Sequence, residues 1–98
     1  MVYNGTQIEA AEPPEFLFKA VDEESADGIF RHGLKRNTGS FVTMYTSKSL
    51  AKNEISVRFP FFYVIMAGLM SDDGYKFYDV GDGKWLAEEV PAKYLRFS

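Results

Sequence analysis

The chain has 98 residues, of which 46% are hydrophobic and 16% aromatic, a composition that supports a packed core and argues against intrinsic disorder. This length fits a single domain over residues 1–98, with an N-terminal arm over 1–15 and a core over 16–97. The lack of cysteine excludes disulfides, thiolate zinc sites and cysteine nucleophiles, and the net charge of -3 gives no electrostatic basis for nonspecific binding to nucleic acid.

Neither a secretory signal nor a membrane-spanning segment is evident. The N-terminus is polar, and the longest apolar run, residues 59–70, contains Pro60 and Gly68 and is too short to cross a bilayer. We therefore expect a cytoplasmic protein that does not contact a membrane. The single His32 cannot assemble a histidine-rich metal site, so we expect no metal ion.

The first half of the core predicts a strand, a helix and a second strand. Residues 16–21 form a short apolar run typical of a strand. Asp22 then offers an N-cap, two glutamates follow it, and Gly33 supplies a stop, which together predict a helix between them. We expect a loop over residues 35–40 and a second strand over residues 41–46, which are rich in β-branched and aromatic side chains.

The middle of the chain predicts a short capped helix over residues 47–53. A continuous apolar run over residues 61–65 follows, and we expect it to be a central strand buried on both faces. Residues 66–73 suit one helical turn or an irregular bend.

The end of the chain predicts a hairpin and a last strand. Residues 75–80 and 84–86 flank Gly81-Asp82-Gly83, a strong hairpin signal, and residues 91–97 are expected to form the last strand. The total of about six strands and two helices predicts a small mixed α+β domain.

The stretch from Phe61 to Leu95 resembles the C-terminal part of the catalytic lobe of the RNA 2'-phosphotransferase family. That family has an apolar strand, a Met, an Asp-Gly, a Phe-Tyr, a Gly-x-Trp-Leu and a Val-Pro-x-x-Tyr-Leu in this order. The corresponding residues are Met70, Asp73-Gly74, Phe77-Tyr78, Gly83-Lys84-Trp85-Leu86 and Val90-Pro91-Ala92-Lys93-Tyr94-Leu95. Upstream, Ile29 to Leu34 resembles the family's step from a helix to Gly-Leu, so the resemblance covers residues 16–95.

The resemblance implies an ADP-ribosyltransferase fold, a small split mixed or antiparallel sheet with short helices, and NAD+ as a co-substrate in a cleft of that sheet. In the family, ADP-ribose passes to an RNA 2'-phosphate and nicotinamide leaves, which requires cations near the diphosphate and polar groups around the ribose. The family's N-terminal winged-helix lobe supplies RNA contacts. Residues 1–15 are too few to form it, so we expect no nucleic-acid partner.

Several positions depart from the family pattern. The His-Gly-Thr triplet of the family's first strand is replaced by Lys19-Ala20-Val21, and the His that follows a Val on the second strand is replaced by Thr43. The family's Ser-x-Asn-Gly before the Trp has become Val80-Gly81-Asp82-Gly83, whereas the Arg of its Gly-x-Arg step is kept as Arg58. We therefore expect the scaffold to be retained and the RNA 2'-phosphotransferase activity to be lost.

Four residues are candidates for the site. Arg58 is the candidate catalytic residue because its guanidinium can pair with a nucleotide diphosphate, the alternative being a surface ion pair. Lys19, Thr43 and Tyr45 join it as candidate NAD+-binding residues. Thr43 and Tyr45 alternate along one strand and so share a face, where they either line the cleft or are ordinary core or cross-strand residues. Lys19 either contacts a phosphate or reaches water from an edge strand. Trp85 is expected to be a core residue.

These observations leave two functional hypotheses. The first is a divergent ADP-ribosyltransferase-like domain that binds NAD+ or ADP-ribose. The second is a catalytically inactive scaffold that acts as a protein–protein interaction module through exposed aromatics among Tyr3, Phe41, Phe59 and Tyr63. A concave polar pocket between the halves of the sheet favours the first hypothesis, and a cleft filled by large side chains favours the second.

Overall fold

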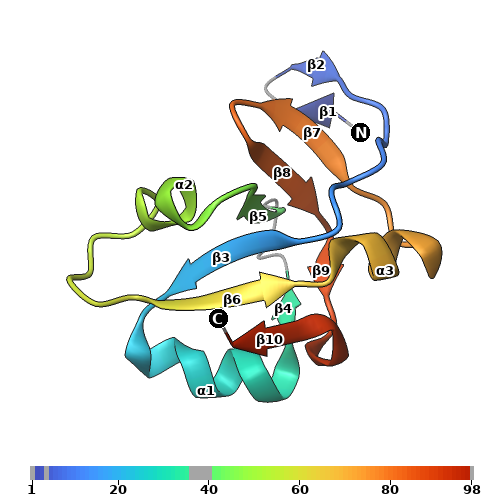
Figure 1. Ribbon diagram of the computed structural model, residues 1–98. Helices are drawn as coiled ribbons and strands as arrows, with labels where there is room; N and C mark the ends of the chain where they lie inside the picture. Colours follow the sequence, from blue (N-terminus) through green and yellow to red (C-terminus); the bar gives the residue numbers. More distant parts are fainter. Residues whose placement is uncertain (1, 4, 36–40, 98) are drawn as a thin grey trace.

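The protein, described here by a computed structural model for residues 2–3, 5–35 and 41–97, is built around a six-stranded antiparallel sheet (Figure 1). The strand order is β10-β6-β3-β5-β8-β7. The strands are β3 (Leu17–Val21), β5 (Val42–Tyr45), β6 (Phe61–Ile65), β7 (Tyr78–Gly81), β8 (Lys84–Ala87) and β10 (Leu95–Phe97). The helices are α1 (Glu23–His32), α2 (Lys48–Lys52), α3 (Ala67–Asp72) and a 3₁₀ turn, η1 (Ala92–Tyr94). The α+β class predicted from the sequence is confirmed.

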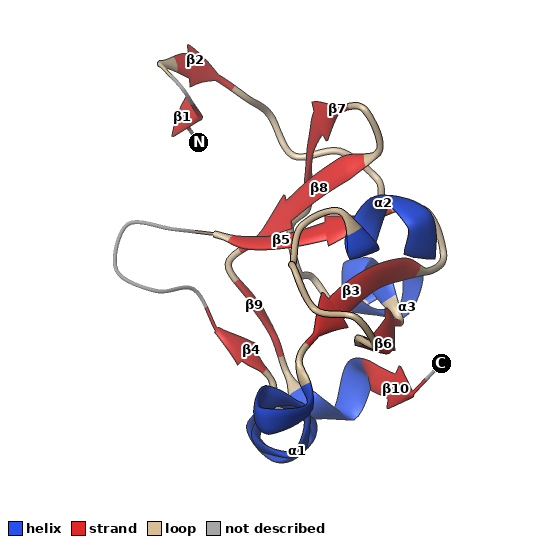
Figure 2. Ribbon diagram, turned by 90° about the vertical axis from the view of Figure 1, so that its left-hand side faces the viewer, coloured by secondary structure: helices blue, strands red, loops and turns tan. Residues whose placement is uncertain are grey.

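Two small two-stranded ribbons lie outside this sheet. The pair β1 (Val2–Tyr3) and β2 (Thr6–Gln7) belongs to the N-terminal arm, and β4 (Leu34–Lys35) pairs with β9 (Glu89–Val90) (Figure 2). Lys35, which was expected to begin a loop over residues 35–40, belongs to β4, and residues 36–40 lie outside the described part of the chain. The sequence did not indicate β4 because it is only two residues long and depends on its partner β9.

The two predicted helix caps are present. The Asp22 carboxylate accepts a hydrogen bond from the Ser25 amide at 2.8 Å, which satisfies one of the free N–H groups at the start of α1. At the other end, Gly33 has φ 79° and donates its amide to the Ile29 carbonyl at 2.7 Å. Ser47 caps α2 in the same way, accepting from the Leu50 amide at 3.2 Å.

The predicted hairpin is also present, with a turn of the expected chemistry. Asp82 and Gly83 connect β7 to β8 with φ values of 56° and 78°, the double positive φ of a type I′ turn. Strand β7 begins at Tyr78 rather than residue 75. The last strand is likewise shorter than predicted, because residues 92–94 form η1 and only Leu95–Phe97 pair with β6.

The prediction that residues 61–65 are buried on both faces is wrong. Tyr63 and Ile65 are fully buried, but Phe61 is 41% exposed and Phe62 and Val64 are half-buried. Helix α1 contacts the Tyr63 face, where the Tyr63 hydroxyl donates to the Ala26 carbonyl. The opposite face of β6 is only partly covered, so its apolar side chains stay in contact with water.

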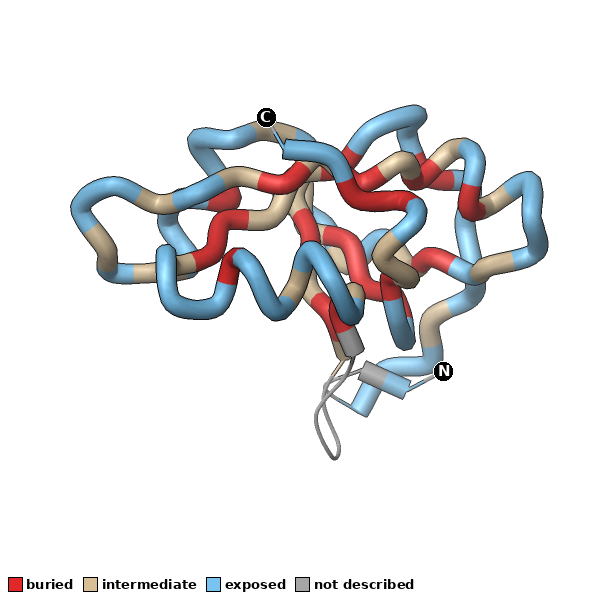
Figure 3. Tube along the Cα trace, turned by 90° about the horizontal axis from the view of Figure 1, so that it is seen from below, coloured by how far each residue is buried: buried red, intermediate tan, exposed pale blue. Residues whose placement is uncertain are grey.

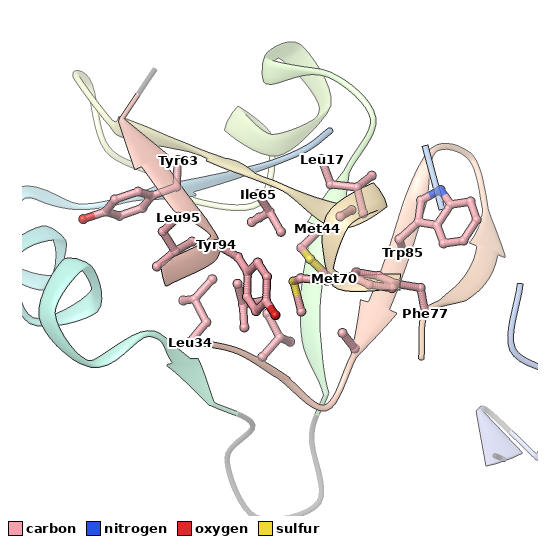
Figure 4. Close-up of a cluster of buried hydrophobic side chains, with 14 of the residues drawn as sticks. Leu17, Leu34, Met44, Tyr63, Ile65, Met70, Phe77, Trp85, Tyr94 and Leu95 are labelled. Atoms are coloured by element: carbon pink, nitrogen blue, oxygen red, sulfur yellow. The ribbon is translucent and has the colours of Figure 1, made fainter. Parts of the chain in front are cut away.

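The core lies between the sheet, α1 and the C-terminal segment (Figures 3 and 4). Buried positions follow the strands through the middle of the molecule, whereas the outer surface of α1 and the connecting loops are exposed. The largest fully buried side chains are Tyr63, Tyr94, Phe77, Leu17, Met44, Ile65, Met70, Leu86, Leu95 and Val90. Trp85 is 8% exposed, which confirms its predicted place in the core. Across the part of the chain described here, we find no helix long and apolar enough to cross a membrane.

Candidate functional site at the fork in the sheet

The central sheet is joined across its middle at one position. Strands β3 and β5 pair only through Phe18 and Tyr45, whereas β3 pairs with β6 at five positions and β5 with β8 at four. If the antiparallel pairing continued, Thr43 would lie opposite Ala20, but no such pair forms. The sheet therefore divides into two three-stranded halves. We call the place where β3 and β5 separate the fork; it runs from Lys19 and Met44 to the strand ends at Val21 and Val42.

Three polar side chains meet at this fork. The Lys19 ammonium donates to the Thr43 hydroxyl at 2.9 Å and lies 3.0 Å from a Glu54 carboxylate oxygen. The Thr43 hydroxyl donates to the other oxygen of Glu54. Each group thus contacts both of the others, and the cluster joins β3, β5 and the end of α2.

Each member is positioned by a different element. Lys19 lies in β3 directly after the single pairing position, and Thr43 lies two residues before the corresponding position in β5. Glu54 follows the C-cap of α2, and its amide donates to the Ala51 carbonyl at 3.2 Å. Because Ala51 is fully buried, it anchors α2, and this anchor sets where the Glu54 side chain starts.

The cluster is only partly accessible to water. The side chains of Lys19 and Glu54 are 18% and 25% exposed. Partly desolvated charges need a partner, and each supplies it for the other. The alternative that Lys19 reaches water from an edge strand is wrong, because β3 is flanked by β6 and β5.

The other two predicted site residues do not join this cluster. Arg58 is exposed in the connection between α2 and β6, and its guanidinium lies 5.3 Å from the centre of the Phe59 ring. Among the described residues, no acidic side chain pairs with Arg58, so the surface ion pair considered for it is not found there. Tyr45 is half-buried beside the fork, and the alternating burial of β5 places it on the Thr43 face.

Comparison of the sequence with known proteins shows which family the chain resembles. No protein-family profile matches the chain. The chain is 33% identical over 87 residues to a probable RNA 2'-phosphotransferase of Flavobacterium johnsoniae, covering 88% of the chain and 48% of that protein. It is 32% identical over 93 residues to one of Nostoc punctiforme and over 91 residues to one of Rhizobium johnstonii, covering 92% and 90% of the chain but 50% and 49% of those proteins. The chain is a divergent relative of the RNA 2'-phosphotransferases.

The chain spans about half the length of these curated RNA 2'-phosphotransferases. The family resemblance inferred from the C-terminal residues is therefore confirmed for the aligned part.

Most residues that reveal the RNA 2'-phosphotransferase family build the core. Met70, Phe77, Trp85 and Tyr94 are all buried. The Tyr94 hydroxyl donates to the Asp73 carboxylate at 2.6 Å, and this hydrogen bond, helped by burial, raises the pKa of Tyr94 to about 12. The motif thus ties the end of α3 to η1.

Glu54 is the member of the cluster that sequence reasoning missed. It lies 35 residues from Lys19 in the chain, and no spacing rule links the two. The signals that existed were the lysine inside an apolar run, which predicts a partner, and an acidic residue just after a capped helix. Neither signal identifies the pair without the arrangement of the strands.

Concave surfaces occur away from the fork. One hollow of about 380 Å³ is lined by Gly74, Tyr75, Lys76, Tyr78, Glu88 and Glu89. A wider one of about 640 Å³ lies between the N-terminal arm and the β7–β8 hairpin. The four predicted site residues line neither of them.

Proposed function

We propose that this RNA 2'-phosphotransferase-like domain binds an ADP-ribose-containing nucleotide, NAD+ or ADP-ribose, at the fork and does not remove RNA 2'-phosphates. The observation that carries the proposal is the pairing of the Lys19 ammonium with the Thr43 hydroxyl, 2.9 Å apart, where the two halves of the sheet separate. An ammonium beside a hydroxyl can donate hydrogen bonds to the oxygens of a phosphate.

Arg58 supports the same proposal. It lies on the connection that leaves α2, four residues after Glu54, and it is exposed without an acidic partner among the described residues. A guanidinium in this state is available for a bidentate contact with a diphosphate.

The loss of transfer chemistry has its own support. The Lys19 charge is compensated by Glu54 at 3.0 Å, so the fork carries little net positive charge in this state. Transfer of ADP-ribose needs preorganised groups that stabilise the developing charge at the ribose, and a mutually satisfied ion pair is poorly suited to that role. The positions of the family's histidines hold Lys19 and Thr43, which supply one cation and one hydroxyl instead.

Saturation-transfer NMR with NAD+ tests the proposal. Binding predicts transfer to the adenine and ribose protons, weakened in Arg58→Ala and unchanged in Arg31→Ala. The second variant is a matched control because Arg31 is an exposed arginine on α1, paired with Asp27. No growth of free nicotinamide above the buffer rate and no loss of an internal 2'-phosphate from RNA are expected. Turnover of either substrate would refute the loss of activity, and no transfer at millimolar NAD+ would refute the site.

A second candidate, a protein–protein interaction module, has one observation in its favour. Phe30 and Phe97 stack with ring centres 4.8 Å apart although they are 44% and 54% exposed, and Phe97 belongs to the edge strand β10. This is not the aromatic set expected from the sequence. Tyr63 is fully buried, so the expectation is wrong for this residue.

Of the other predicted contact residues, Phe59 is 80% exposed and Phe41 is half-buried. The side chain of Tyr3 lies outside what the structure describes. If the protein shows no transfer from NAD+, the Phe30–Phe97 surface becomes the better candidate for function.

A further inference from the structure

We propose that Glu54 is an internal competitor for the anionic part of the nucleotide, so that a phosphate reaches Lys19 only when the Glu54 carboxylate leaves the fork. This inference rests on the proposed function and adds a regulatory residue to the same site. It concerns how strongly the site binds, and not whether it exists.

The geometry of the carboxylate supports this role. One Glu54 oxygen lies 3.0 Å from the Lys19 ammonium, and the other accepts from the Thr43 hydroxyl. A phosphate bound to the same two groups would use two of its oxygens in the same way. The two anions cannot occupy Lys19 and Thr43 together, because like charges at such distances repel.

Glu54 is attached so that it can leave. It is the second residue of the connection from α2 to β6, residues 53–60, which contains no helix or strand. The buried anchor of α2 is Ala51, three residues earlier, so moving the Glu54 side chain need not expose the core. The cost of release is the loss of a partly exposed ion pair and its hydrogen bond with Thr43.

Release changes the charge of the fork. With Glu54 in place, the cluster of Lys19 and Glu54 is neutral, and an incoming diphosphate gains little from it. With Glu54 out, the ammonium and the Thr43 hydroxyl keep their contact with each other but lose their anionic partner, and so favour another anion. The apparent affinity is therefore the intrinsic affinity multiplied by the fraction of molecules in which Glu54 has left the fork.

Titration of the 98-residue protein with ADP-ribose, followed by amide chemical shifts, tests this mechanism. In Glu54→Gln the side chain keeps its size but loses its charge and one of the two acceptor oxygens that hold Lys19 and Thr43, so ADP-ribose should bind about fivefold tighter than to the wild type. The matched control is Glu88→Gln, which removes one negative charge from an exposed side chain outside the cluster and should leave the affinity unchanged. The gain in Glu54→Gln should disappear when Lys19→Met is added.

The outcomes separate this inference from the proposed function. Equal affinities for the wild type and Glu54→Gln would overturn the competition by Glu54 while leaving the nucleotide site in place. An equal gain in Glu88→Gln would also overturn it, because the effect would then follow net charge. Binding by none of the proteins would overturn the proposed function itself.

A conservative variant covers the case in which Glu54→Gln perturbs the fold. Glu54→Asp keeps the charge but shortens the side chain by one methylene, so its carboxylate reaches Lys19 and Thr43 less well. A two- to threefold gain in affinity, about half the effect of full release on a logarithmic scale, is expected. No gain in a folded Glu54→Asp protein would count against the proposal.

Discussion

Replacing Gly33, the C-cap of α1, by alanine should destabilise the protein, whereas the same change at a glycine inside α1 should not. Gly33 ends α1 with φ 79° and ψ -177°, a combination that is accessible essentially only to glycine. A Cβ atom placed there would lie 2.4 Å from the Val90 carbonyl oxygen and 2.8 Å from the Ala92 amide nitrogen. Both neighbours are backbone atoms, so the clash cannot be relieved by rotating a side chain.

The expected loss of stability has two contributions, the strained backbone conformation and the clash of the Cβ atom. The backbone conformation costs alanine about 1–3 kcal/mol, and separating α1 from the β9–η1 segment costs about 1 kcal/mol more. The total of about 2–4 kcal/mol is a large part of the stability of a small domain. At about 4–8 °C per kcal/mol, the melting temperature should fall by about 10 °C or more.

The control is Gly28→Ala, in the interior of α1. A Cβ atom at Gly28 meets nothing within 4 Å, and its φ is not positive. Alanine should therefore stabilise the helix by about 0.5–1 kcal/mol. Urea unfolding followed by circular dichroism measures both changes. If Gly33→Ala loses less than about 1 kcal/mol, or if the two variants shift stability in the same direction, the described contact between Gly33 and β9 is incorrect.

Two further predictions concern buried tyrosines. The hydrogen bond to Asp73 raises the pKa of Tyr94 from 10.0 to about 12. The stabilisation that the neutral Tyr94 hydroxyl gives the folded state is therefore fully present below pH 10 and is lost as the pH rises from 10 to 12. Tyr94→Phe should lower stability at pH 8 and flatten the fall between pH 10 and 12. An unfolding series that keeps the same alkaline slope in both proteins would contradict this. Tyr63→Phe removes the bond to the Ala26 carbonyl and should cost about 1 kcal/mol in urea unfolding, with no change expected in nucleotide binding.

Local chemistry made several elements predictable. Asp22 and Gly33 bound α1 because a side-chain cap and a positive φ act on the nearest turn of the chain. The Asp82-Gly83 turn was predictable for the same reason, since both residues accept the positive φ of a type I′ turn. The order of the C-terminal motif was enough to reveal the resemblance to the RNA 2'-phosphotransferases, which the comparisons confirm.

The candidate site was only half predictable. Thr43 and Lys19 were identified from their positions on strands, and the structure brings them together. The sequence assigned Arg58 and Tyr45 to the same site, but neither contacts Lys19 within the described interactions of the cluster. Resemblance places residues on the correct element, but it does not determine how a loop such as 53–60 is oriented.

The sequence by itself determined the helix caps and the hairpin turn, because each depends on residues that are neighbours along the chain, and it revealed the family resemblance through the order of its C-terminal motifs. Only the tertiary structure decided that β3 and β5 pair at a single position, that Glu54 reaches Lys19 and that Phe61 is exposed. These features depend on which strands lie side by side and on which faces are covered. Such contacts join residues far apart in the chain, and the apolar pattern of one segment contains no information about its partner.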